Sequence, residues 1–197
     1  MKTRKYQKVA TSVKTAYLNS SDEFALWMFK NHLPQVAHYA LKLSQKYQAN
    51  PDLTVAGAWL HDFGDAFVNR FHPNHLNITN QKAENILNQV GYNSSEIKII
   101  LNDVLKYHSC KNNKLPQTIE GKVLATADAL AHLQTDFYLQ FAWMNLPEGK
   151  SFPEFIQWVN KKIDRDFNQK IFFPEEKKAI TKRYQALKSV FQTHSLA

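Results

Sequence analysis

Residues 53–63 decide the fold class, and they read Leu-Thr-Val-Ala-Gly-Ala-Trp-Leu-His-Asp-Phe. Nearly every position up to Leu60 is apolar or small, so a helix formed here has no polar face and belongs in the middle of a domain. The stretch ends in two adjacent polar residues, His61 and Asp62. An ionised carboxylate in such surroundings is costly unless a cation or several donors accompany it. We therefore expect a central helix with a polar site at its end.

The segments on both sides of this stretch also have helical periodicity. With only 5 Gly and 7 Pro in 197 residues, the chain is too poor in turn residues for a β-sandwich or barrel, and we expect an all-α fold. The expected helices cover residues 3–18, 20–33, 34–47, 53–63, 80–90, 94–108, 118–141, 153–167 and 174–193. Loops are expected over residues 48–52, 65–80 and 110–117, and a turn over residues 147–149.

Side-chain type and spacing also predict where several of these helices begin and end. The expected amino-terminal caps are Ser20, with Glu23 in a capping box, then Thr79 or Asn80, and then Ser94 or Ser95. Gly91 is expected to end the helix over residues 80–90.

The formal net charge of the chain is +8, and its basic residues gather near the two ends. Positive charge attracts phosphate polyanions, either nucleic acid or a small phosphorylated substrate, although a solvated basic surface is an equal alternative. The one cysteine, Cys110, rules out an internal disulfide and fits a reducing compartment. No apolar run approaches the roughly 20 residues that span a bilayer. The basic start of the chain has no apolar signal region, so we expect a cytoplasmic location without membrane contact.

Two further polar residues match His61 and Asp62 in their surroundings. His32 lies beside an apolar helix, and Asp128 lies inside Leu124-Ala125-Thr126-Ala127-Asp128-Ala129-Leu130. A buried acid in that small, apolar helix again requires a cationic partner. Imidazole nitrogen together with carboxylate oxygen suits Mn, Fe, Co, Ni, Mg or Zn, so these four residues predict a divalent metal site.

The ordered set His32, His61-Asp62 and Asp128 resembles the H…HD…D signature of the HD-domain superfamily of metal-dependent phosphohydrolases. The flanking sequences agree with it, namely Asn31-His32-Leu33-Pro34-Gln35-Val36-Ala37, Ala58-Trp59-Leu60-His61-Asp62-Phe63-Gly64 and Ala125-Thr126-Ala127-Asp128-Ala129-Leu130. The resemblance covers about residues 24–140. It implies an HD-like helical bundle, with the four residues as ligands of one metal.

Some members of the superfamily bind a second metal through two histidines in the interval between the HD pair and the last aspartate. His75 and His108 are placed for that role here, or else for binding substrate phosphate, capping a helix or lying in a loop. Two metals about 4 Å apart would hold both the attacking and the leaving oxygen. The sequence does not decide whether the site binds one metal ion or two.

Asp65 follows the HD pair and could act as general base, or it is a loop or capping carboxylate. Arg70, Lys106 and Lys111 are candidates for binding the substrate phosphate, with plain solvation as the alternative. The chain lacks the H-D-x-x-E-D pattern of guanosine tetraphosphate hydrolases and the G-Y-P segment of cyclic di-GMP phosphodiesterases. Both departures argue against those two activities.

The expected function is hydrolysis of a phosphate ester, with a nucleotide among the candidate substrates, by a metal-activated water. The alternative is a non-catalytic, metal-containing ligand-sensing or regulatory HD-like module. A nucleic-acid-binding protein is supported only by the charge, and an HD-type oxygenase would need six firm iron ligands. Turnover, duplex DNA binding and iron content would separate these classes.

The expected domain organisation is one helical domain over residues 1–197. The metal-binding core covers about residues 24–140, and the helices over about residues 150–194 pack on it. Their apolar stripe includes Phe155, Val159 and Ile163, and it must be buried on this core or in a homodimer.

Overall fold

The computed structural model describes residues 4–145 and 151–192, and within these ranges the chain forms helices and no strand. The all-α fold class predicted from the sequence is therefore confirmed. Among the described residues, no helix combines the length and the apolar character that crossing a membrane requires. The expected turn over residues 147–149 and the outermost residues of the first and last expected helices lie outside the described residues.

The helices run in chain order as follows: α1 (Lys5–Leu18), α2 (Glu23–Trp27), α3 (Leu33–Lys46), α4 (Pro51–Leu60), α5 (His75–Val90), α6 (Ser94–Ile99), α7 (Ile119–Gln134), α8 (Phe137–Asn145), α9 (Phe152–Arg165) and α10 (Pro174–Val190). Two short 3₁₀ turns interrupt the loops, η2 (Phe63–Ala66) and η4 (Lys111–Asn113). Three wider π-type turns extend helices, η1 (Met28–His32), η3 (Ile100–Leu105) and η6 (Asp166–Lys170). Such π turns occur often at functional sites.

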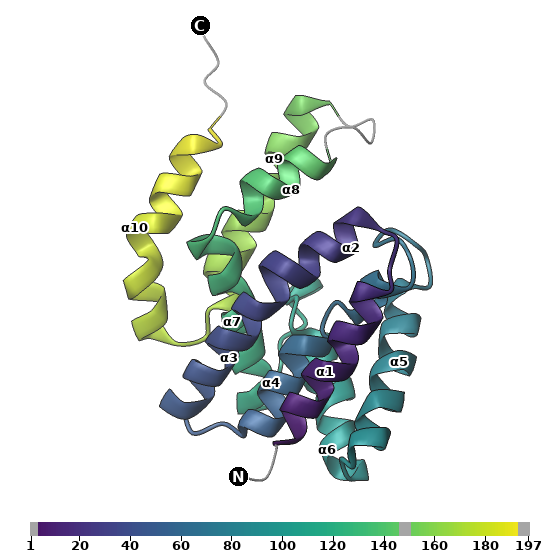
Figure 1. The fold of residues 1–197 in the computed structure, drawn as a ribbon. Helices are drawn as coiled ribbons and strands as arrows, with labels where there is room; N and C mark the ends of the chain where they lie inside the picture. The colour runs from purple at the N-terminus through teal and green to yellow at the C-terminus, as the bar shows by residue number, and fades with distance from the viewer. Residues whose placement is uncertain (1–3, 146–150, 193–197) are drawn as a thin grey trace, which may run out of the picture.

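Helix α4 lies at the centre of the helices shown in Figure 1 and contacts α1, α3, α7 and η3. Its residues from Leu53 to Ala58 are all buried, as its lack of a polar face predicts. Gly57 permits the close approach of η3, because a Cβ atom at this position would lie 2.5 Å from Val104 Cγ1. The polar end of α4 therefore points into the interior, where the surrounding helices can add to it.

The cap of α2 corrects the expectation that placed it at Ser20. Asp22 precedes the helix, and its Oδ1 accepts hydrogen bonds from the backbone N–H groups of Phe24 (2.8 Å) and Ala25 (3.1 Å). Ser20 Oγ instead accepts from Asp22 N at 3.2 Å. A carboxylate that accepts hydrogen bonds from two backbone N–H groups at a helix start also interacts favourably with the helix dipole. This explains why Asp22, and not Ser20, caps α2.

The start of α5 also differs from the expectation, because the helix begins at His75 and not at Thr79 or Asn80. Thr79 lies inside the helix, where its hydroxyl accepts from Gly64 N at 3.0 Å and donates to the carbonyl oxygen of His75 at 2.9 Å. Thr79 thus bonds to the backbone of a turn 15 residues earlier in the chain. The sequence around Thr79 does not indicate such a partner. Gly91 ends the helix with a φ of 91°, as expected.

Two other boundaries are corrected as well. Asn93 caps α6, in place of Ser94 or Ser95, and forms a capping box with Glu96. The expected single helix over residues 118–141 is divided, because Thr135 has extended backbone between α7 and α8. Helix α8 can therefore leave the direction of α7.

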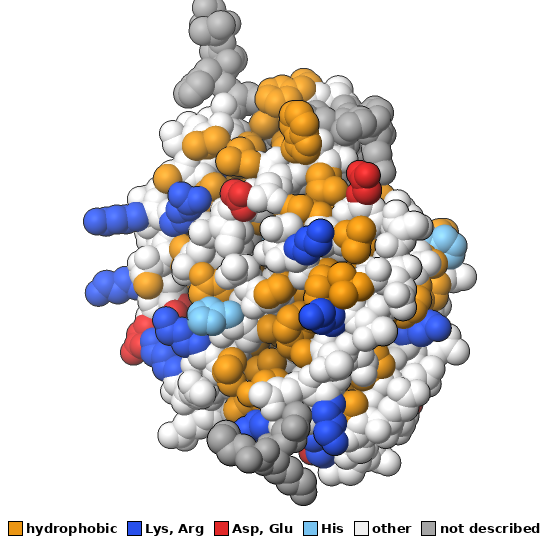
Figure 2. All heavy atoms as spheres, viewed as in Figure 1, with side chains coloured by type: hydrophobic (Ala, Val, Ile, Leu, Met, Phe, Trp, Pro, Cys, Tyr) orange, Lys and Arg blue, Asp and Glu red, His pale blue; other side chains and the backbone are white. Residues whose placement is uncertain are grey.

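The carboxyl-terminal segment contacts the central helices through α10, which packs on α7 and α9, and through η6, which packs on α7. Within α7, Thr126 Oγ1 donates to the carbonyl oxygen of Lys170 at 3.1 Å and accepts from Phe172 N at 3.1 Å. Figure 2 shows basic side chains gathered along the α10 edge of this face, with hydrophobic side chains across its middle.

Helix α7 is anchored by a buried carboxylate at its amino end. Asp103 accepts from the backbone N–H groups of Gln117 (2.8 Å) and Thr118 (2.9 Å) and from the hydroxyl of Thr118 (2.5 Å). Thr118 in turn caps α7 by accepting from Gly121 N at 3.0 Å. This network sets the position of α7 and of the acid in its middle.

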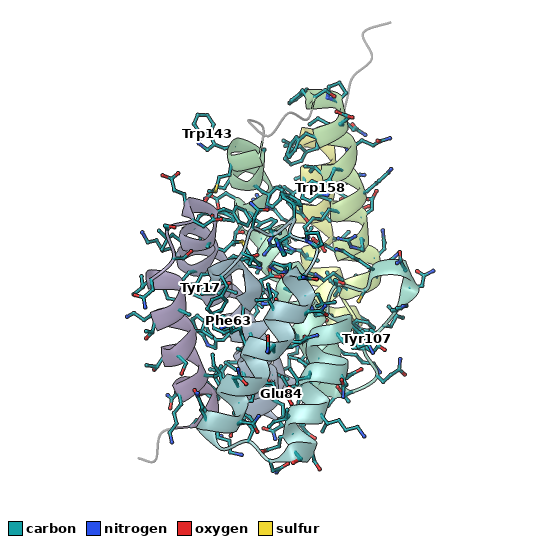
Figure 3. The ribbon with its side chains drawn as sticks, turned by 90° about the vertical axis from the view of Figure 1, so that its right-hand side faces the viewer. Tyr17, Phe63, Glu84, Tyr107, Trp143 and Trp158 are labelled. Atoms are coloured by element: carbon teal, nitrogen blue, oxygen red, sulfur yellow. The ribbon has the colours of Figure 1, made fainter. Side chains whose placement is uncertain are left out.

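We predict that Asp103→Ala lowers the free energy of unfolding by about 3 kcal/mol, because it leaves buried N–H donors without an acceptor. Chemical denaturation of the purified variant measures this. The control is Glu84→Ala on exposed α5 surface (Figure 3), expected to change stability by less than about 0.5 kcal/mol. An equally small effect of Asp103→Ala would show that this network does not hold α7.

Candidate metal centre

Three polar side chains from separate helices converge beside the end of α4. His32 is the last residue of η1, His61 follows α4 directly, and Asp128 lies in the middle of α7. All three are buried, with exposed fractions of 2%, 4% and 3% respectively. These are three of the four residues that the sequence predicts as metal ligands.

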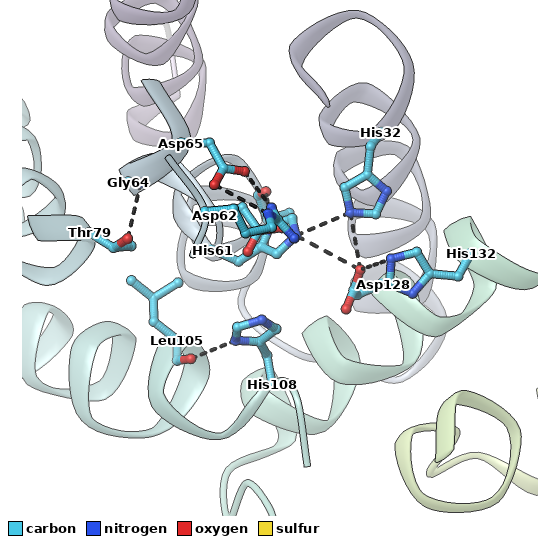
Figure 4. Close-up of polar contacts among 12 residues, drawn as sticks. His32, His61, Asp62, Gly64, Asp65, Thr79, Leu105, His108, Asp128 and His132 are labelled. Carbon is cyan, nitrogen blue, oxygen red and sulfur yellow. Dashed lines mark hydrogen bonds and ion pairs between the residues drawn. The ribbon is translucent and has the colours of Figure 1, made fainter. Parts of the chain in front are cut away.

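The ligand atoms of these residues surround one point, as Figure 4 shows. The Nε2 atom of His32 lies 3.3 Å from His61 Nε2 and 3.2 Å from Asp128 Oδ1. His61 Nε2 lies 3.8 Å from the same carboxylate oxygen. Among the described residues, this His32, His61 and Asp128 group can offer its ligand atoms to a single ion.

The surroundings of Asp128 Oδ1 indicate whether a cation fits this centre. It is buried and has no hydrogen bond of acceptable geometry, although three imidazole nitrogens lie close to it. A buried carboxylate oxygen without a donor is costly. A divalent ion among the three atoms would satisfy the oxygen, so the residues present fit a metal.

The orientation of His61 agrees with metal binding. Its Nδ1 lies 2.8 Å from the carbonyl oxygen of Ala58, and because a carbonyl only accepts, Nδ1 must carry the proton. In the neutral ring Nε2 then has a free lone pair that faces the centre. His108, beyond η3, is oriented in the same way by the carbonyl oxygen of Leu105 at 2.6 Å.

Asp62, the fourth predicted ligand, is adjacent to the centre but has another partner. Its Oδ2 lies 3.2 Å from His61 Nε2 and 2.7 Å from Arg70 Nη2. The backbone of Asp62 is held by Tyr17, whose hydroxyl donates to its carbonyl oxygen at 2.7 Å. Tyr17 also packs against Phe63, with ring centroids 6.2 Å apart (Figure 3).

Asp65 lies in η2, three residues after Asp62, and is 2% exposed. Its carboxylate accepts from the guanidinium of Arg70 and from His75 Nε2, the latter at 2.7 Å. The turn that carries it requires Gly64, because a Cβ atom there would collide with Thr79 and lie 2.9 Å from His75 Nε2. His75 is thus bound to Asp65 and is not part of the three-residue group that surrounds the ion site.

Sequence reasoning missed His132, which lies one helical turn after Asp128 on α7. Its Nε2 is 3.3 Å from Asp128 Oδ1, and its ring stacks on His32 with centroids 4.8 Å apart. Its Nδ1 lies 2.9 Å from Asp166 Oδ2. The spacing of four residues from an acid inside an apolar helix was the signal that could have identified it.

Sequence reasoning also missed the buried pair Asp166 and Lys170 in η6. Lys170 forms ion pairs with Asp128 and, at 3.5 Å, with Asp166 Oδ1. Asp166 also accepts from the Tyr138 hydroxyl at 2.5 Å and from Lys162 Nζ at 3.1 Å. No local pattern placed these residues at the centre, because their contacts depend on how η6 packs on α7.

Both carboxylates at the centre are held in the ionised form. Burial alone would raise the pKa of Asp62, but Arg70 and His61 outweigh it and hold this pKa well below the usual range. Burial would likewise raise the pKa of Asp128, which His132 and Lys170 hold well below the usual range. Both side chains therefore contribute negative charge to the centre, and each has one cationic side-chain partner.

The histidines have mostly the neutral form that metal binding requires. Burial lowers the pKa of His32. Burial and the nearby His61 lower the pKa of His108 to about 4, and burial lowers that of His132 to about 3. His61 differs: burial lowers its pKa, but Asp62 and Asp128 outweigh this and raise it above 6.5.

A cavity of about 320 Å³ opens onto the centre. Asp62, Asp128, His75, His108 and His132 line it. Its cationic lining residues are Arg70, Lys111, Lys162, Arg165 and Lys170, and its aromatic ones are Phe71, Phe137, Phe141 and Trp158. Among the lining residues, cationic side chains therefore outnumber the carboxylates, which are Asp62 and Asp128.

Of the three residues predicted to bind the substrate phosphate, two line this cavity and one does not. Arg70 and Lys111 line it, whereas Lys106 does not and instead lies with its Nζ 5.3 Å from the centre of the Tyr107 ring. Asp65 is not a lining residue either.

A model of the HD domain family matches residues 29–133 of the chain, which is more than half of its length. The match contains His32, His61, Asp62 and Asp128. No curated protein and no solved structure matches the chain.

We predict that Asp128→Asn abolishes stoichiometric metal binding, because it removes the charge that the ion would neutralise while preserving side-chain shape. Elemental analysis of the purified variant measures this. Asp164→Asn, at an ion pair with Lys188 away from the centre, is the control and should retain the metal. Full metal content in Asp128→Asn would contradict the proposed ligand. Two ions per chain, with one lost in His75→Ala or His108→Ala, would instead indicate a dinuclear centre.

We predict that metal affinity increases with pH as the pH passes through the raised pKa of His61, above 6.5. The protonated imidazole cannot bind a cation, so binding must release this proton at lower pH and needs no release at higher pH. Calorimetric titration in buffers of different ionisation enthalpy counts the protons released. A proton release that does not change with pH in this range would contradict the assignment.

Proposed function

The chain belongs to the HD domain family, and from that premise we propose that it is a metal-dependent phosphohydrolase that cleaves a phosphate ester. The observation that carries the proposal is the buried Asp128 Oδ1, which lies near three imidazoles without a hydrogen bond, beside a cation-lined cavity. A divalent ion bound there supplies a water of lowered pKa and polarises a phosphoryl oxygen.

The cations of the cavity support a phosphate as the substrate group. Arg70 and Lys170 both line the cavity, and each is bound to one carboxylate of the centre. Guanidinium and ammonium groups bind phosphate oxygens through charge-assisted hydrogen bonds. An ester phosphate at the centre would therefore meet the positive charge of two side chains, in addition to the ion.

The aromatic lining supports a substrate with a flat or apolar part. Trp158 of α9 and Phe141 of α8 stack with ring centroids 4.8 Å apart and an interplanar angle of 16°. Such rings stack on nucleobases in many binding sites. A nucleotide combines an anionic group with a flat base, so we propose a nucleotide as the substrate class to test first.

The contacts of Asp65 favour a positioning role over direct proton transfer. Its carboxylate is occupied by Arg70 and His75, and it does not line the cavity, whereas both of its partners do. We propose that Asp65 orients Arg70 toward the phosphate and holds the ring of His75. The general base expected from the sequence remains the alternative for Asp65.

A second candidate function is a metal-containing ligand-sensing or regulatory module without turnover. The observation that favours it is that both carboxylates already have cationic side-chain partners, Arg70 for Asp62 and Lys170 for Asp128. These ion pairs would stabilise the centre whether or not the protein catalyses hydrolysis.

Elemental analysis combined with a screen of phosphomonoesters and phosphodiesters across Mn, Co, Ni, Mg and Zn separates the two functions. Metal-dependent turnover that is lost in His61→Ala supports the hydrolase. Stoichiometric metal and ligand binding without turnover of any ester supports the regulatory module.

We predict that Asp65→Asn keeps the metal and lowers kcat by about 10- to 100-fold, the range for residues that orient the groups around a metal site. Steady-state kinetics with parallel elemental analysis measures both. Glu84→Gln on α5 is the matched control and should match the unmodified protein. A loss near 10⁴-fold, together with the disappearance of the acidic limb of the pH profile, would show instead that Asp65 is the general base.

A further inference from the structure

Two of the five cations that line the cavity differ from the rest, because they form no ion pair within the part of the chain that the structure describes. These two are Lys111 and Arg165. The other three all contact carboxylates: Arg70 with Asp62 and Asp65, Lys162 with Asp166, and Lys170 with Asp128 and Asp166. Three of the cations thus have carboxylate partners, and two have none among the described residues.

Arg165 is the last residue of α9. Its Nε is buried and has no hydrogen-bond partner among the described residues. A buried donor of a charged group without an acceptor costs more than a neutral one, and a bound anion would remove that cost. Arg165 lies outside residues 29–133, so the matched domain does not account for it.

Lys111 begins η4, in the loop that follows His108, and is exposed at the cavity. Partial desolvation of its ammonium lowers its pKa, and the guanidinium of Arg165 lowers it further. Both cations line the same cavity, so their like charges act on each other there. An anion between them would replace this repulsion with two attractions.

Neither cation forms an ion pair with Asp62, Asp65 or Asp128, whose cationic partners are Arg70 and Lys170. A phosphate held at the centre by the ion, Arg70 and Lys170 would leave them without a counter-charge. The cavity, at about 320 Å³, is within the usual range of small-ligand sites, roughly 300–1,000 Å³. It can therefore hold more than one anionic group.

We propose that Lys111 and Arg165 form a second anion subsite, and that the substrate is a phosphate ester with a further anionic group, such as a second phosphate. The proposal rests on the proposed function, in which the first phosphate binds at the metal centre. It assigns to the segment beyond the matched domain a role in selecting the substrate.

The test uses ligands that cannot be hydrolysed. Alkane bisphosphonates with one to three carbons are each compared with the monophosphonate of the same carbon number, by calorimetric titration into the full-length protein loaded with Mn²⁺. We expect at least one bisphosphonate to bind about tenfold or more tightly than its matched monophosphonate, corresponding to about 1.4 kcal/mol.

The double variant Lys111→Met/Arg165→Met should remove this preference, while binding of the monophosphonate changes by less than about twofold. The matched control is Lys114→Met/Lys161→Met, which removes two exposed lysines from the same loop and the same helix without touching the cavity. It should keep the preference. Helical circular dichroism confirms that all variants are folded.

The proposal is overturned if no bisphosphonate binds more tightly than its monophosphonate, or if the preference persists in the double variant. It is also overturned if both ligands weaken equally, because the two cations would then serve the first phosphate. Failure of the proposed function has a different signature, since a protein that hydrolyses no ester can still show or lack the preference for two anionic groups.

Discussion

The negative charge of Asp128, buried in the apolar helix α7, is the constraint on which the rest of the centre depends. An isolated ionised carboxylate in such a place would cost several kcal/mol. Its surroundings supply positive or polarisable partners from distant parts of the chain, His32 from η1 and Lys170 from η6. The charge thus connects the amino-terminal, central and carboxyl-terminal helices, and one of its oxygens still lacks a hydrogen bond.

Two charge networks surround this carboxylate and keep its neighbours in place. In the first, Arg70 joins Asp62 to Asp65. In the second, Asp166 contacts His132, Tyr138, Lys162 and Lys170. Each network includes residues that line the cavity, Arg70 in the first and His132, Lys162 and Lys170 in the second. Rigid support of this kind is what a metal centre needs from the residues around its ligands.

The candidate ligands were accessible from the sequence because each interrupts an apolar helix with a polar group whose burial needs compensation. His32, His61 and Asp128 could be predicted in this way, and the structure brings them together. His132 could have been found from its spacing to Asp128. Arg165 and Lys170 could not, because on the sequence they resemble any solvated basic residue, and only the packing of η6 against α7 brings them to the cavity.

The sequence by itself determined the helical class and the burial of α4, because hydrophobic periodicity and the scarcity of Gly and Pro are properties of short segments. It also determined that polar groups would be buried at the end of that helix. Only the tertiary structure decided that Thr79 bonds Gly64 instead of capping α5, and that Lys111 rather than Lys106 lines the cavity. These outcomes depend on partners distant in sequence, whose hydrogen bonds and charges act only once the helices have packed.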